Sequence, residues 1–229
     1  MARQPTSGAM TTRAQSRTMT TRAQSRGEEI ANSVSHGVAL VAALAAGPLM
    51  IAAINQRGQA SSIGVAVFTL TMVLLYSTST LYHALPAGRA KRIVLKLDHG
   101  AIYIFIAGSY TPFALDALSS VYGWAMFSLV WSLALAGVTL KACGRLNQVW
   151  LSTGLYLLLG WLVLAAALPL LAHLSPDTRA LLVAGGLAYS GGVVFFMLDS
   201  RLVYAHAVWH CFVVAGTACH LFAVLDYAA

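Results

Sequence analysis

Charged residues are scarce in this chain. Of its 229 residues only 9% are charged and 59% are hydrophobic, and the mean hydropathy is +0.74. Soluble domains carry about 25% charged residues, so this composition predicts an integral membrane protein. The apolar runs are rich in Ala, Leu and Gly and lack alternating polar positions, which argues against a membrane β-barrel.

Cysteine is also rare, because the chain has only Cys143, Cys211 and Cys219. Three cysteines cannot all pair with one another. On one helix, Cys211 and Cys219 would lie about 12 Å apart along the axis, which is too far for a disulfide. No disulfide is expected.

Long hydrophobic runs are abundant, and each approaches or exceeds the roughly 20 residues that a helix needs to cross a bilayer. The sequence therefore predicts an all-α, polytopic membrane protein, a seven-transmembrane-helix bundle within a membrane domain that spans residues 28–229. The expected helices lie approximately at 34–54, 62–84, 97–116, 121–140, 148–170, 180–198 and 204–225. Pro86 and Gly88 are expected to end the second helix. The glycines at 185, 186, 191 and 192 are expected to permit close helix packing.

The first 27 residues differ from the rest in composition. They contain the sequence TTRAQSR twice, at 11–17 and 20–26, among Thr, Arg, Gln and Ser residues with little to bury. Such a segment is predicted to be a disordered, basic cytoplasmic tail. An organellar transit peptide is also Arg-rich and poor in acids, but this segment has no apolar stripe.

The positions of the basic residues predict the orientation in the membrane, because Lys and Arg in short loops are retained in the cytoplasm. With the amino terminus inside, 12 of the 14 basic residues are cytoplasmic, and only Arg57 and Arg179 lie outside. The amino terminus is therefore expected to be cytoplasmic and the carboxyl terminus outside. The net charge of +7 then reflects topology and attraction to anionic lipid headgroups, and no nucleic-acid partner is expected.

Ionisable side chains within membrane helices cost free energy and mark functional sites. His206 and His210 are four residues apart, which places them on one helix face about 6 Å apart along the axis. This spacing suits two imidazoles that bind one zinc ion. The same spacing also arises by chance, or from residues that cap polar helix contacts.

The predicted topology adds further residues at the same depth. It places the end of the second helix with His83, the start of the third with Asp98 and the start of the seventh on one side of the membrane. Ser79 precedes His83 by four residues and can hydrogen-bond a metal ligand, a bound water or a substrate carbonyl. His36 is a candidate for the outer shell of the site or for a polar helix cap. His220 would lie about 15 Å from His210 and cannot bind the same ion.

Four stretches of the chain resemble the hemolysin III branch of the progestin and adipoQ receptor family, relatives of the adiponectin receptors. They are GEEIANSVSHG at 27–37, STLYHAL at 79–85 continuing to LDHGAIYIFIAGSYTP at 97–112, GGLAYSGGVVFF at 185–196, and HAVWHCFVVAGTACH at 206–220. The resemblance implies a seven-helix bundle with zinc bound near the cytoplasmic side by His83, His206 and His210. Asp98 then reaches the zinc through water. The implied location is the bacterial cytoplasmic (inner) membrane.

Three functions are compatible with these residues. In the first, the protein is a zinc-dependent, ceramidase-like hydrolase of membrane lipid amides or esters that serves lipid homeostasis, with Asp98 as the water-holding general base and Ser79 as oxyanion support. In the second, the zinc is structural and the bundle is a receptor or lipid sensor. The third is a cytolysin or channel, which the scarcity of ionisable residues at mid-membrane disfavours. Another ion that imidazoles bind is the alternative to zinc.

Overall fold

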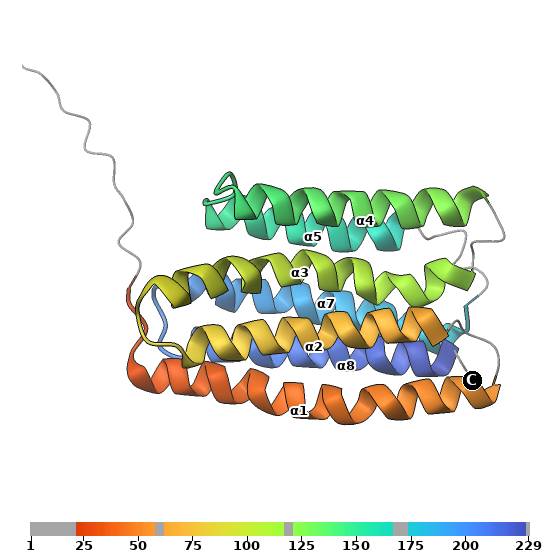
Figure 1. Ribbon diagram of the computed structural model, residues 1–229, viewed down its shortest axis with the longest axis horizontal. Coiled ribbons are helices and arrows are strands. Elements are labelled where there is room, and N and C mark those ends of the chain that lie inside the picture. Colours follow the sequence, from red (N-terminus) through yellow and green to blue (C-terminus); the bar gives the residue numbers. More distant parts are fainter. Residues whose placement is uncertain (1–21, 58–61, 117–120, 167–173, 228–229) are drawn as a thin grey trace, which may run out of the picture.

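The computed structural model describes residues 22–57, 62–116, 121–166 and 174–227. Throughout this part of the chain the only regular elements are α-helices. The helices are α1 Arg26–Arg57, α2 Ser62–Ala84, α3 Arg89–Asp116, α4 Val121–Ala142, α5 Val149–Ala166, α7 Pro176–Leu198 and α8 Ala205–Tyr227. Their axes run side by side, with α1 at one edge of the bundle, α4 and α5 at the other, and α2, α3, α7 and α8 between them (Figure 1).

The chain is a multi-pass integral membrane protein. Among the described residues, five helices are long and apolar enough to cross a membrane: α1, α2, α4, α7 and α8. The apolar part of α5 is shorter, at Val149–Leu162, and α3 begins with several basic residues. Large apolar side chains face outward, with Leu49 70% and Ile63 69% exposed, as is favourable where the surroundings are lipid rather than water.

Three helices begin earlier than the hydropathy predicts, and one of them is α7, which begins at Pro176 rather than near residue 180. Helix α1 begins at Arg26 rather than near residue 34, and α3 begins at Arg89 rather than near residue 97. The expected boundaries differ because polar residues end an apolar run without ending the helix. In α1, Glu28 and Glu29 stabilise the amino-terminal turn through their interaction with the helix dipole. Helix α2 ends at Ala84, two residues before Pro86, as expected.

Close packing of α7 against α8 depends on small residues. A Cβ atom on Gly185 would lie 2.4 Å from Cδ2 of His220, and one on Gly192 would lie 2.6 Å from Cβ of Phe212. These two positions confirm the predicted packing role of the glycines. At Gly186 and Gly191 an added Cβ would make only ordinary contacts, at 3.6 and 3.5 Å. The packing fixes α8, which carries two of the candidate metal ligands.

Candidate metal centre

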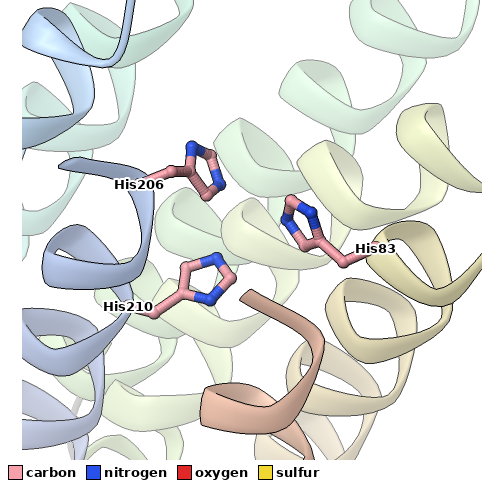
Figure 2. A group of neighbouring side chains, drawn as sticks. All are labelled: His83, His206 and His210. Atoms are coloured by element: carbon pink, nitrogen blue, oxygen red, sulfur yellow. The ribbon is translucent and has the colours of Figure 1, made fainter. Parts of the chain in front are cut away.

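Three histidines from two helices meet at one end of the bundle. His83 lies in the last turn of α2, and His206 and His210 lie in the first two turns of α8. One nitrogen from each ring lies within 4.8 Å of the other two, and the rings face a common point (Figure 2). The ring centroids are 5.0 Å apart for His83 and His206, and 4.8 Å apart for His206 and His210. The predicted proximity of these three side chains is therefore confirmed.

The first histidine, His83, is held through its Nδ1 atom. This nitrogen lies 2.8 Å from Oε2 of Glu29 on α1, while the other carboxylate oxygen accepts a 2.6 Å hydrogen bond from Lys91. Because an ionised carboxylate only accepts, Nδ1 carries the hydrogen and Nε2 has a lone pair. Nε2 is buried and has no hydrogen-bond partner. It is the nitrogen available to a metal ion.

His210 is arranged in the same way by α1. Its Nδ1 lies 3.1 Å from the backbone oxygen of Asn32 and 2.9 Å from Oγ of Ser35. The Ser35 hydroxyl itself donates to the Asn32 oxygen, so Nδ1 of His210 donates to both groups and its Nε2 keeps a lone pair. The side chain is 2% exposed. Two of the three imidazoles are thus fixed in the tautomer that leaves Nε2 free to bind metal.

His206 faces a carboxylate in the connection between α7 and α8. Its Nδ1 lies 3.3 Å from Oδ2 of Asp199, an ion-pair distance without the angle of a good hydrogen bond. The same oxygen accepts a 2.9 Å bond from Gln24. Burial raises the pKa of Asp199, but His206, Gln24 and Arg22 together bring it below its ordinary value. Asp199 is therefore ionised at neutral pH and can orient the imidazole.

Asp98 and Ser79 lie beside the three histidines and not among them. The Ser79 hydroxyl lies 2.7 Å from Nδ1 of His36, and Ser79 and Asp98 line the same cavity. The His36 ring stacks on His210, with centroids 3.6 Å apart and an angle of 6° between the planes. The structure thus brings every residue predicted for the site into one region. The roles of these residues as ligands, base and support stay predictions.

A cavity of about 190 Å³ adjoins this region. Asp98, His206 and His210 line one end, and His220 lines it further along α8. Most of the wall between them consists of aliphatic and aromatic side chains from α3, α5, α7 and α8. Such a cavity suits an apolar chain whose polar end lies near the histidines.

Comparison with known proteins identifies the family of the chain. The family model described as haemolysin-III related matches residues 24–221. The chain belongs to the haemolysin III-related family. It is 38% identical to the hemolysin-3 of Bacillus cereus over 87% of this chain and 91% of that protein. It is 40% identical to the hemolysin-3 homolog of Bacillus subtilis (strain 168), over 87% of this chain and 94% of the other.

A more distant relative is the human monocyte to macrophage differentiation factor, which is 27% identical over 87% of this chain and 84% of its own length. These matches support the predicted place of the chain in the hemolysin III branch of the progestin and adipoQ receptor family. No solved structure matches the chain. The haemolysin III-related match begins at Gln24 and therefore includes the segment that contacts Asp199.

Several residues of the site escaped prediction from sequence. Glu29, Asn32 and Ser35 on α1 contact the histidines, and Gln24 links the Asn32 side chain to Asp199 through bonds of 2.8 and 2.9 Å. One signal was available, because Glu29, Asn32 and His36 are spaced three and four residues apart and so share one helix face. A polar stripe of this kind, at the end of an apolar helix, indicates a buried polar partner.

Proposed function

We propose that this haemolysin III-related protein is a zinc-dependent hydrolase of membrane lipid amides or esters. The observation that carries the proposal is the group of three imidazoles within 4.8 Å of one another, beside a carboxylate at the end of an apolar cavity. Nitrogen ligands in this number, with a further coordination position left for water, are typical of catalytic zinc. The unpartnered Nε2 of His83 fits this donor set, since a buried lone pair without a partner is costly.

Each side chain has a distinct part in the proposed reaction. Bound zinc would supply a Lewis acid that polarises the substrate carbonyl and lowers the pKa of water. Asp98 holds the attacking water, accepts its proton and passes that proton to the leaving nitrogen or oxygen. Ser79 donates to the carboxylate and so orients it toward the water. His36 supports Ser79 through the 2.7 Å contact of its Nδ1.

The apolar cavity supports an acyl chain as the part of the substrate that the bundle encloses. An amide or ester group at the head of such a chain would lie beside Asp98 and the histidines, and the chain would extend along α8 toward His220. Burial of the chain in the cavity supplies binding free energy without polar contacts. The proposed substrate is therefore a membrane lipid.

We further propose that all seven helices cross the bacterial inner membrane with the amino terminus in the cytoplasm. The distribution of Lys and Arg supports this orientation. The candidate metal centre then lies at the cytoplasmic ends of α2 and α8, and the water for hydrolysis enters from that side.

Substitution of Asp98 tests turnover separately from metal binding. Asp98→Ala is expected to keep the zinc and the fold while fatty-acid release falls by about 10²–10⁴-fold, the contribution of a general base. The assay is mass spectrometry of fatty acid released from lipid extracts by the purified protein. Asp226→Ala is the control, because Asp226 lies at the other end of α8, where it accepts hydrogen bonds from Ser175 and Thr178. Loss of zinc and thermal stability in Asp98→Ala would instead favour a structural zinc site in a receptor or lipid sensor.

A further inference from the structure

The carboxylate of Glu29 is shared between a lysine and a candidate metal ligand. Oε1 accepts from Nζ of Lys91 at 2.6 Å, and Oε2 lies 2.8 Å from Nδ1 of His83. We infer that Glu29, held in place by Lys91, is the positioning residue that fixes the His83 tautomer for metal binding. The inference rests on the metal site of the proposed function and assigns a role to α1, which provides none of the three histidines.

Lys91 is itself firmly placed, so it determines how the Glu29 side chain is oriented. Its ammonium donates a second hydrogen bond to the Leu85 carbonyl at 3.2 Å and lies 4.8 Å from the centre of the Tyr82 ring. The Lys91 side chain is 16% exposed and that of Glu29 is 25% exposed, whereas His83 is 1% exposed. The three groups form a chain that leads from the protein surface to the buried imidazole.

The chemistry of the three groups dictates which nitrogen of His83 carries the hydrogen. An ammonium group can only donate and a carboxylate can only accept, so one oxygen serves Lys91 and the other receives the Nδ1 hydrogen of His83. Nε2 is then the free lone pair, and the carboxylate also makes the imidazole a stronger ligand.

A glutamine at this position would reverse the arrangement, because an amide has one oxygen and one NH2 group. Lys91 requires the oxygen, so the NH2 group would face Nδ1 of His83. Nδ1 would then have to accept, and the imidazole hydrogen would move to Nε2 and block the metal-binding lone pair. If Lys91 is also replaced by an apolar residue, the amide can turn its oxygen toward His83 and restore the original tautomer.

The neighbouring residue Glu28 provides a matched control. It is 1% exposed and is also fully hydrogen-bonded, to Arg22, to the backbone of Ser25 and to the backbone of Tyr204. None of these contacts involves the three histidines. Glu28→Gln therefore alters a more deeply buried carboxylate one residue away without a direct effect on the metal site.

The experiment measures Zn²⁺ affinity by chelator competition on the full-length protein in detergent, together with the visible spectrum of the Co²⁺-loaded protein. Glu29→Gln is expected to bind Zn²⁺ about 10–100-fold more weakly than the wild type and to change the Co²⁺ spectrum. Glu29→Gln/Lys91→Met is expected to recover most of the affinity. Glu28→Gln is expected to bind Zn²⁺ as the wild type does, although its thermal stability falls.

Three results would overturn the inference while the proposed function stands. They are wild-type affinity in Glu29→Gln, failure of Lys91→Met to restore affinity in the double variant, and an equal loss in Glu28→Gln. If Glu29→Gln does not fold, Glu29→Asp replaces it: the shorter carboxylate should give an intermediate affinity, and unchanged affinity would contradict the role. A wild-type protein without affinity for Zn²⁺ would overturn the proposed function itself.

Discussion

The Ser79 hydroxyl connects residues from three helices at the candidate site. It lies 2.7 Å from Nδ1 of His36 on α1, and Ser79 lines the same cavity as Asp98 on α3. Ser79 and His36 are both 3% exposed, so their contact is shielded from bulk solvent. An unpaired buried donor costs more than the bond contributes, which makes this single oxygen important for stability.

Ser79→Ala is therefore expected to lower the free energy of unfolding by about 1–3 kcal/mol, because Nδ1 of His36 loses its hydrogen-bond partner. Thermal unfolding in detergent micelles measures the effect. Ser77→Ala, a half-buried serine on the same helix, should change stability less. Equal losses in the two variants would contradict the role assigned to the hydroxyl.

The candidate ligands could be predicted from the sequence, whereas their hydrogen-bond partners could not. The spacing of His206 and His210 and the topology that places His83 near them are properties of the linear sequence. The contacts of Glu29 and Asp199 depend instead on how α1 packs against α2 and how the α7–α8 connection turns toward α1. The polar stripe of α1 indicates that a partner exists. Hydropathy alone, however, places the start of the first helix near residue 34 and so leaves the turn that carries Glu29 outside it.

At the scale of the helices, the position of α8 depends on how closely it approaches α7. Gly192 of α7 packs against the side chains of Trp209 and Phe212 on α8. A Cβ atom added to Gly192 would lie 2.9 Å from Cε3 of Trp209. Trp209 immediately precedes His210. A displacement of α8 at this point would therefore move two of the three candidate ligands together.

Gly192→Ala is expected to destabilise the protein by about 1–3 kcal/mol, the usual range for overpacking, and to weaken zinc binding. Gly191→Ala, one residue away, should be tolerated, since its added methyl would meet Phe212 at an ordinary 3.5 Å. Thermal unfolding and zinc competition on the two variants make the comparison. A stable Gly192→Ala protein with full zinc affinity would show that α8 does not depend on this contact.

At the scale of the whole molecule, the proposed orientation assigns each loop to one side of the membrane. Cys143, just after α4, is exposed and follows Lys141 in a loop assigned to the cytoplasm. Arg179, near the start of α7, is exposed and assigned to the opposite side. Both assignments follow from the distribution of Lys and Arg among the loops.

In a Cys211→Ala/Cys219→Ala background, a membrane-impermeant maleimide is expected to label Cys143 only after the cells are permeabilised. With Cys143→Ala added, Arg179→Cys should be labelled in intact cells. The readout is the mass shift of the purified protein. Labelling of Cys143 in intact cells would reverse the proposed topology and place the candidate metal centre outside the cell.

Metal content is the most direct test of the central claim that His83, His206 and His210 form a metal centre. Elemental analysis of the purified full-length protein should find about one zinc ion per chain in the wild type, as a single three-histidine site requires. It should find none in the His83→Ala/His206→Ala/His210→Ala variant. Equal metal content in the two proteins, or no metal in a folded wild type, would contradict the claim.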